Sequence, residues 1–276
     1  MATGTAATAA DTDEVLTAPP SPLEYMATVI AHDLEDGQWV EVGANSPVPR
    51  AGALLAHLTR GPNMNVMLAL TKSYLYDEPV VEEFDYLTDV AAMRWAEAYY
   101  PHDRLLSDMK QRRNGVFFCG GIQFDRFGNS NLIGVGPDHS RLAFRGPGAI
   151  GTCNATVVNG RYHLIATSHS PRTLVERVDY ISALGYGDGS DPDIRRRLGI
   201  DSDPRYLITP MCVFDFDPDT RAARLASVHP PNTVEEVLAA TGFEVQVPDE
   251  VPETPGPTAE ELRVLRTRLD TRGALR

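Results

Sequence analysis

Cysteine is scarce in this chain of 276 residues, which contains only Cys119, Cys153 and Cys212. The three are odd in number, far apart and embedded in apolar sequence, which argues against a disulfide framework and a cysteine zinc site. We expect reduced thiols buried in the core, with a reactive thiol as the alternative. The seven histidines also lack metal-ligand spacing, so no metal site is predicted.

Positive charge is in short supply. The 25 Lys and Arg residues are outnumbered by 38 Asp and Glu, which gives a net charge of −13 and argues against nucleic acid as the main partner. The basic runs at 111–113 and 195–197 are local exceptions, which we interpret as solvated or interface faces.

Targeting and membrane signals are missing as well. No apolar run approaches the ~18 residues of a membrane span. Residues 1–20 lack the cationic start and apolar core of a secretory signal, and we interpret them as a disordered tail. We therefore expect a cytoplasmic protein with no membrane partner.

The familiar nucleotide and hydrolase motifs are absent too. Neither G-x-G-x-x-G nor G-x-x-x-x-G-K-[ST] occurs, which leaves a dinucleotide fingerprint and a P-loop unsupported. No G-x-S-x-G is present. Ser168 and His169 are adjacent, but neighbouring residues of a strand face opposite ways, which argues against a Ser–His triad.

The periodicity that is present alternates between helix and strand and predicts an α/β fold with a mostly parallel sheet. Capping boxes begin helices at Ser21 and Thr258. Predicted helices cover 21–34, 51–58, 89–99, 102–112, 233–241 and 259–269. Predicted strands cover 39–42, 65–70, 116–119, 155–158, 162–167, 175–181, 205–209, 212–216 and 224–228, with a hairpin turn at 159–160. We expect one domain over 21–245, then a proline-rich linker and C-terminal helix over 246–276.

The most informative stretch runs from Gly115 to Gly136. An apolar strand breaks at Gly120 and Gly121, and short polar side chains follow at Gln123, Asp125, Asn129 and Asn131. Glycine lets a backbone approach a ligand, and such loops build sites at the carboxyl end of a sheet. Three interpretations stay open: a ligand loop, a structural turn capped by Asp125 and Asn129, or a subunit contact.

A second glycine turn contains Gly146, Gly148 and Ala149. Its backbone N–H groups could cradle an oxyanion or a thioester oxygen, and a purely structural turn is the alternative.

These motifs together resemble one family. The loop from Gly120 to Asn131 resembles the GG/A-x-Q-x-D-x-x-G-N-x-N segment of class I CoA-transferase β subunits, especially those of the glutaconate CoA-transferase branch. Further matches follow in the family's order at 36–43, 146–149, 178–181, 212–216, 229–230 and 241–245. The resemblance covers about residues 22–270.

The resemblance implies an α/β CoA-transferase (NagB/RpiA-like) fold, with flanking helices and a homologous α subunit, commonly in an α2β2 assembly. It implies coenzyme A as part of the substrate and no tightly bound cofactor. It also assigns Gly120, Gly121, Gln123, Asp125, Asn129, Asn131, Gly146, Gly148 and Ala149 to the acyl-CoA cleft.

The chain departs from the family at its catalytic position. The transferases attack the thioester with a glutamate just after the strand that contains Val66, but this chain has Leu70, Thr71 and Lys72 there. Neither Leu70 nor Thr71 can form the anhydride that nucleophilic catalysis by a carboxylate requires.

Two branches with this fold also lack the glutamate. A steroid-ring hydrolase resembles this chain in its Leu-Thr pair and in a Ser-x-His-Pro segment like residues 227–230, whereas a decarboxylase has cysteine at that point. The resemblance therefore implies C–C hydrolysis or lysis of an acyl-CoA, with Thr71 at the glutamate position and a base that the α subunit could carry. The alternatives are a transferase that uses Glu78, and a non-catalytic subunit.

Overall fold

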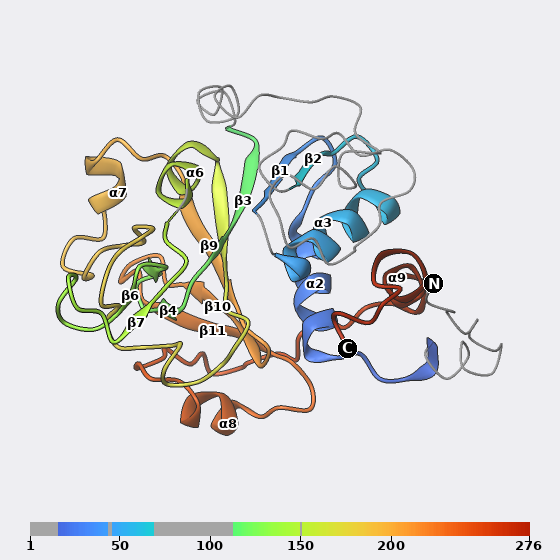
Figure 1. The fold of residues 1–276 in the computed structure, drawn as a ribbon. Helices are drawn as coiled ribbons and strands as arrows, with labels where there is room; N and C mark the ends of the chain where they lie inside the picture. The colour runs from blue at the N-terminus through green and yellow to red at the C-terminus, as the bar shows by residue number, and fades with distance from the viewer. Residues whose placement is uncertain (1–15, 44–45, 69–112, 150) are drawn as a thin grey trace, which may run out of the picture.

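The computed structural model describes residues 16–43, 46–68, 113–149 and 151–276 (Figure 1). A seven-stranded sheet runs through them in the order β11-β10-β9-β8-β3-β1-β2. Its strands are β1 (Trp39–Val42), β2 (Asn65–Leu68), β3 (Gly115–Gly120), β8 (Arg161–Ile165), β9 (Asp203–Ile208), β10 (Cys212–Phe216) and β11 (Ala223–Val228).

The five strands from β2 to β9 in this order are parallel, and β10 and β11 add an antiparallel edge. The predicted α/β class with a mostly parallel sheet is confirmed. The helices expected at 89–99 and 102–112 lie outside the described residues.

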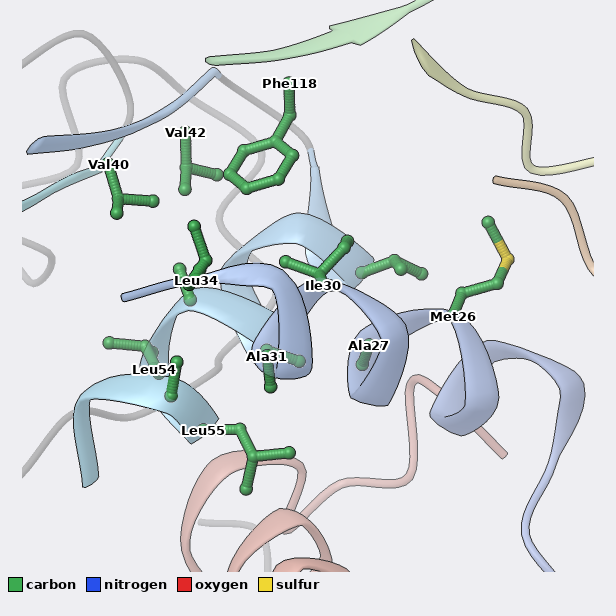
Figure 2. Packing of buried hydrophobic residues seen from close by; sticks show 14 of the residues in the cluster. Met26, Ala27, Ile30, Ala31, Leu34, Val40, Val42, Leu54, Leu55 and Phe118 are labelled. Atoms are coloured by element: carbon green, nitrogen blue, oxygen red, sulfur yellow. The ribbon is translucent and has the colours of Figure 1, made fainter. Parts of the chain in front are cut away.

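Two helices cover one face of the sheet: α2 (Pro22–Asp33) and α3 (Pro47–Thr59). The predicted capping box is present, since Ser21 Oγ accepts from Glu24 N and the Glu24 carboxylate accepts from Ser21 N. The helices cross closely at Gly52, where an added Cβ would lie 2.7 Å from Ala27 O. Figure 2 shows side chains of both helices packed below Val40, Val42 and Phe118 of the sheet.

Alternation along β3 divides the core in two. Val116 and Phe118 enter the cluster under α2 and α3, whereas Phe117 and Cys119 enter a second cluster on the opposite face. The second cluster includes Ala155 of α6 (Thr152–Val158) and Val237 of α8 (Val234–Ala239). The sheet is therefore buried on both faces, as parallel sheets are.

The predicted strand at 155–158 and the hairpin after it are wrong. Residues 152–158 form α6, and β8 runs parallel to β3. Parallel neighbours need a crossover, which a two-residue turn cannot provide, so the β-branched residues of this segment adopt a helix. Glycine is required at position 160, because its backbone packs closely against Arg113 and an added Cβ would lie 2.0 Å from Arg113 O.

The strand predicted at 175–181 is also wrong. The segment is irregular and makes one isolated bridge, between Val175 and Gly242. It is instead held by hydrogen bonds to the side chains of Gln123 and Asp125, in the central loop of residues 120–131 described below.

Short elements complete the chain: β4 (Gln123–Phe124), β5 (Ser130–Asn131), β6 (Gly134–Val135), β7 (Phe144–Arg145), α7 (Ile194–Arg197), α9 (Ala259–Val264) and the π-helix η2 (Leu265–Leu269). At the C-terminus, Arg266 forms a buried ion pair with Glu24 at 2.7 Å and donates to the carbonyls of Ala18 and Pro19. Within the described ranges, none of the helices has the length and apolar character needed to cross a membrane.

Candidate functional site

The strand order marks where a ligand would bind. The chain passes from β1 to β2 on one side and then returns to β3 on the other side of β1. In open α/β sheets, such a reversal leaves a crevice beyond the carboxyl ends of the two strands concerned. Those ends are Val42–Gly43 on β1 and Gly120–Gly121 on β3. The two strands run parallel, with Trp39 beside Gly115, and β2 ends level with β1, with Leu68 beside Val42.

Gly120 ends β3 and is exposed. Its φ lies outside the left-handed region, and no described atom lies within 4 Å of the position a Cβ would take. Neither backbone conformation nor packing in the described chain requires glycine here. Gly121 differs, since its Cβ would lie 2.7 Å from the ring of Phe124.

The Asp125 side chain organises the loop that follows. Its Oδ1 accepts from the backbone N–H groups of Phe127 and Asn129, both at 3.1 Å, and both its oxygens accept from Asn129 Nδ2 at 2.9–3.0 Å. Burial raises the pKa of the Asp125 carboxyl, and these donors oppose the rise. Asn129 also donates to Gly187 O at 2.6 Å and accepts from Gly185 N at 2.9 Å.

Gln123 and Asn131 form a second buried pair. Asn131 Nδ2 donates to Gln123 Oε1 at 2.6 Å and to Gly134 O at 2.7 Å. Gln123 Oε1 also accepts from Asp179 N at 3.1 Å, while Asp179 Oδ2 accepts from Gly136 N at 2.7 Å.

The four polar side chains predicted for the cleft are thus brought together, each at most 5% exposed, with their oxygens bonded within the protein. This geometry matches the structural-turn interpretation for the side chains. Contact between this loop and a ligand stays a prediction. If such contact is made, the backbone at Gly120 and Gly121 would make it, because the polar side chains are already bonded within the protein.

The second glycine turn lies against the same loop. Gly146 N donates to Ile133 O at 2.8 Å, and Gly148 N donates to Leu132 O at 2.9 Å. Gly148 has φ +92°, which favours glycine. Because Ile122 N donates to Asn131 O, one continuous strip of backbone joins the two glycine segments. The backbone N–H groups of Gly121 and Ala149 have no acceptor among the described residues.

His169 follows the carboxyl end of β8. Its Nε2 lies 3.0 Å from Thr241 Oγ1, whose own hydroxyl donates to Val237 O, so Nε2 carries the proton. Its Nδ1 lies 2.8 Å from Thr209 Oγ1. Burial lowers the pKa of His169 to about 4, so the ring is neutral at pH 7. His169 is bonded to threonines, and no bond joins it to Ser168 in the described chain, so the pair forms no triad.

The cysteine prediction holds for two of the three residues. Burial raises the pKa of Cys119 and of Cys212 to about 12, which makes both thiols inert. Cys153 contradicts the prediction, because it lies on the exposed side of α6.

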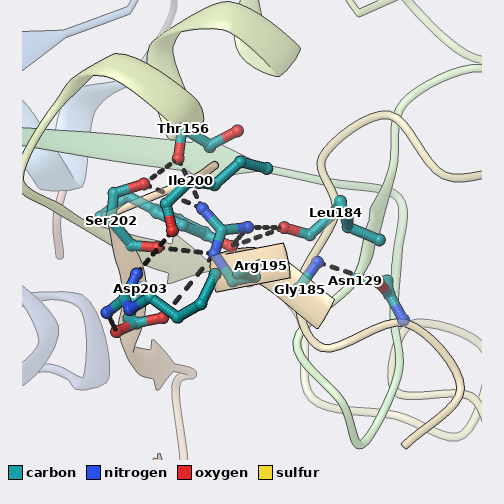
Figure 3. Close-up of polar contacts among 10 residues, drawn as sticks. Asn129, Thr156, Leu184, Gly185, Arg195, Ile200, Ser202 and Asp203 are labelled. Atoms are coloured by element: carbon teal, nitrogen blue, oxygen red, sulfur yellow. Dashed lines mark hydrogen bonds and ion pairs between the residues drawn. The ribbon is translucent and has the colours of Figure 1, made fainter. Parts of the chain in front are cut away.

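Arg195 contradicts the interpretation of the arginine run at 195–197 as a solvated or interface face. It is 1% exposed, and it donates to the carbonyls of Ser202, Thr156 and Leu184 and to Ser202 Oγ (Figure 3). Leu184 directly precedes Gly185, whose backbone N–H donates to Asn129. Through this segment Arg195 stabilises the central loop of residues 120–131 without contacting it directly. Three adjacent arginines give no sequence signal for which one is buried.

The predicted catalytic position lies outside the described residues. This holds for Leu70, Thr71 and Lys72, and for the alternative candidate Glu78. They follow β2, which pairs with β1 at the edge of the crevice. Among the residues that are described, no three His, Cys, Asp or Glu side chains gather closely enough to hold a metal ion.

The structure defines a class of chain: an α/β fold with a mostly parallel sheet whose strand order reverses between β1 and β3, the point at which open sheets of this kind bind ligands. Comparison with known proteins narrows this class. The chain is 31% identical over 245 residues to the B component of 3-oxoadipate CoA-transferase of Pseudomonas knackmussii, and the match spans 88% of this chain and 91% of that protein. The chain belongs to the CoA-transferase family, as a B subunit.

Solved structures agree with this assignment. Glutaconate coenzyme A-transferase of Acidaminococcus fermentans matches with a TM-score of 0.81 and 26% identity, over 92% of this chain and 96% of that one. The cholesterol ring-cleaving hydrolase IpdB subunit of Rhodococcus jostii is 28% identical, over 90% of this chain and 92% of that protein. The IpdAB structure from the same organism gives a TM-score of 0.77 at 25% identity, over 94% and 98%. No protein-family model matches the chain.

Proposed function

We propose that this chain is the B subunit of a two-subunit enzyme that cleaves a C–C bond in an acyl-CoA thioester. The observation that carries the proposal is the pair Leu70-Thr71, which the resemblance aligns with the nucleophilic glutamate of the family's transferases. Without a carboxylate at that point, no glutamyl-CoA intermediate can form. The similarity to a ring-cleaving hydrolase supports the same direction.

The proposed chemistry keeps the thioester intact. Water adds to a carbonyl that is β to the thioester, the C–C bond between them breaks, and its electron pair passes into the thioester carbonyl as an enolate. The enolate then takes a proton at carbon. The base that activates the water is assigned to the A subunit, and coenzyme A enters only as part of the substrate.

The crevice offers donors for the enolate oxygen. The N–H groups of Gly121 and Ala149 are free of acceptors in the described chain, whereas those of Gly146 and Gly148 are bonded to the residues that follow β5. Preorganised backbone donors stabilise a developing oxyanion strongly. We therefore assign this role to Gly121 and Ala149, with Gly120 leaving space for the thioester. Thr71 is proposed as a further contributor on sequence grounds alone, because the resemblance aligns it with the family's glutamate.

The test uses the A–B complex with a β-dicarbonyl acyl-CoA, linear or cyclic. A cyclic substrate should give one opened acid that retains its CoA thioester and gains one water in mass, whereas a linear substrate should give two products, a free acid and a shortened acyl-CoA. Treatment with acyl-CoA and borohydride should leave activity unchanged, because no enzyme-bound thioester accumulates. An adduct on a B-subunit carboxylate would instead establish transferase chemistry.

That transferase is the second candidate, and the 31% identity to a 3-oxoadipate CoA-transferase favours it. It requires another carboxylate, of which Glu78 is the best placed in the sequence. Glu78→Gln would then abolish CoA exchange between an acyl-CoA and a free acid, whereas the hydrolase proposal predicts no effect of this change on C–C cleavage. A non-catalytic B subunit would give neither activity.

A further inference from the structure

The hairpin of β6 and β7 projects from the central loop directly beside the second glycine turn. Its strands pair Gly134 with Arg145 and Val135 with Phe144, and residues 137–141 and 143–145 are all exposed. Arg145 immediately precedes Gly146, so this arm begins where the proposed thioester site ends.

Two arginines on this arm have no partner among the described residues. Arg141 and Arg145 are exposed and make no ion pair, side-chain hydrogen bond or ring contact there. Among the other exposed arginines, Arg197 pairs with Asp191 at 2.5 Å and Arg263 with Glu260 at 2.5 Å. Arg172 and Arg177 resemble the two arginines of the arm, because they are exposed and have no ion pair or side-chain hydrogen bond among the described residues. Arg141 and Arg145 differ from these in position, since both lie on the arm that leads into the second glycine turn.

The acids near the arm are already engaged. Asp138 Oδ1 accepts from Ser140 N at 2.9 Å and from Ser140 Oγ at 2.8 Å. Asp179 Oδ2 accepts from Gly136 N at 2.7 Å. Neither carboxylate forms an ion pair with Arg141 or Arg145, so both guanidinium groups stay available for an external anion.

The backbone of the arm is fixed even though its side chains are exposed. Ala143 N donates to Val135 O at 2.9 Å, and Tyr180 OH donates to Gly136 O at 2.6 Å. The cations are therefore held on a preformed support, which lowers the ordering cost of binding.

We infer that Arg141 and Arg145 bind the phosphate groups of the coenzyme A moiety while the glycine turn holds its thioester. This inference rests on the proposed acyl-CoA function. Guanidinium groups pair with phosphates through charge-assisted, often bidentate hydrogen bonds. Arg145 immediately precedes Gly146, and Arg141 lies further from it along the arm, at the turn where its backbone N donates to Asp138 O. The two cations thus lead away from the glycine turn along the chain, as the phosphates of coenzyme A lie away from its sulfur, across the pantetheine arm.

The competing occupant of this arm is the A subunit. Phe144 is 55% exposed and lies between the two arginines, and aromatic and arginine side chains are common at protein interfaces. The two occupants make different demands on Phe144. Successive strand side chains point to opposite faces, so Phe144 and Arg145 need not serve one ligand. Phosphate binding needs the cations alone, whereas a docked subunit would also need the aromatic ring.

The experiment measures calorimetric binding of free coenzyme A and 3′-dephospho-coenzyme A to the purified A–B complex. Arg141→Ala and Arg145→Ala should each weaken coenzyme A binding about three- to tenfold, because each removes charged hydrogen bonds at an exposed site. The double variant should lose most of the wild-type preference for coenzyme A over the 3′-dephospho form. Arg197→Ala and Arg263→Ala, on α7 and α9, are the matched controls and should leave binding unchanged.

The outcomes distinguish a failure of the proposed acyl-CoA function from a failure of the inferred phosphate contacts. No binding by the wild-type complex would overturn the acyl-CoA function itself. Wild-type binding that survives in the double variant would overturn only the phosphate contacts. Dissociation of the complex by Phe144→Ala or by the arginine variants, seen by size-exclusion chromatography, would assign the arm to the A subunit and also overturn the inference.

Discussion

Arg195 shows how one side chain can support a site that it does not enter. It has the largest volume among the side chains that are under 2% exposed in the described residues. Its closest bonds go to three carbonyls and one hydroxyl, and Tyr162 OH at 3.4 Å and Asp203 Oδ1 at 3.7 Å are further partners. One of these carbonyls belongs to Leu184, beside the Gly185 amide that holds Asn129. A buried cation is tolerated only when its donors are satisfied in this way.

Replacing Arg195 by lysine should therefore be costly even though the charge is kept. Lysine cannot reach all four acceptors in the guanidinium geometry, so buried carbonyls would lose their donors. We expect Arg195→Lys to lower the free energy of unfolding by about 3 kcal/mol. Urea denaturation followed by circular dichroism measures this change.

Arg197→Lys is the control for this prediction. The Arg197 side chain is 67% exposed and pairs only with Asp191 among the described residues, so its replacement should alter stability by less than about 0.5 kcal/mol. Equal effects of the two substitutions would mean that the network in Figure 3 does not stabilise the fold.

At the scale of elements, the contact between α2 and α3 depends on a glycine inside a helix. Glycine in a helix interior is about 1 kcal/mol less favourable than alanine, so Gly52 has a packing reason to be there. An added Cβ would lie 2.7 Å from both Ala27 O and Ile30 Cβ. The close approach of the two helices sets how α2 lies on β1 and β3.

Gly52→Ala should consequently destabilise the protein even though alanine favours helix. Overpacking against a backbone oxygen costs about 1–3 kcal/mol, which exceeds the gain in propensity, so a net loss of about 1–2 kcal/mol is expected. Thermal unfolding measures this loss.

Gly120→Ala is the matched glycine substitution. It meets no described atom and should leave the melting temperature unchanged while weakening acyl-CoA binding to the A–B complex. Destabilisation by Gly120→Ala, or none by Gly52→Ala, would contradict this account of the two glycines.

The elements that can be predicted from the sequence are those whose own pattern decides them. The capping box at Ser21 and the apolar alternation of β3 are local signals, and both are present in the structure. The segment 155–158 cannot be predicted in this way, because its β-branched residues favour strand locally, whereas the parallel pairing of β3 with β8 demands a crossover.

For the candidate site, the sequence singles out residues by their type, but the roles of those residues depend on contacts that the sequence does not reveal. Gly120, Asp125 and Asn129 stand out by residue type. The structure places Gly120 at the end of β3, beside the strand reversal, and buries Asp125 and Asn129 within the loop that follows. Whether an oxygen faces a ligand or a neighbouring amide depends on its tertiary partners. Those partners include Val178, Gly185 and Gly187, which lie some fifty residues away in the chain. Sequence spacing carries no information on such distant contacts.

At the scale of the whole molecule, buried neutral histidines tie distant segments together. His229 Nε2 donates to Thr209 O at 3.0 Å, at the end of β9, and its Nδ1 accepts from Thr254 Oγ1 at 2.8 Å in the C-terminal segment. His169 joins the end of β8 to Thr241 after α8. Burial lowers the pKa of His229 and of His169 to about 4, and it also lowers the pKa of His163 on β8.

This arrangement predicts a loss of stability in mild acid. A histidine with a pKa of 6.5 unfolded and about 4 folded stabilises the native state fully above pH 6.5 and loses that contribution as the pH falls toward 4. The depression at His229 corresponds to about 3 kcal/mol. Each such histidine makes the free energy of unfolding fall by about 1.4 kcal/mol per pH unit within this window. The carboxylates of Asp33 and Glu261, whose pKa values are lowered, add to the loss only at lower pH.

His229→Gln isolates one of these contributions. A glutamine amide can keep the donor to Thr209 O but takes up no proton, so the variant should lose stability less steeply between pH 6.5 and 5. Urea unfolding of wild type and variant at half-unit pH steps gives the two slopes, and their difference should approach one proton. An unchanged slope would mean that His229 is not held neutral in the fold. If the variant does not fold, NMR titration of the His229 ring in the wild-type protein gives a second test. An apparent pKa near 6.5 in the native protein would also contradict the prediction.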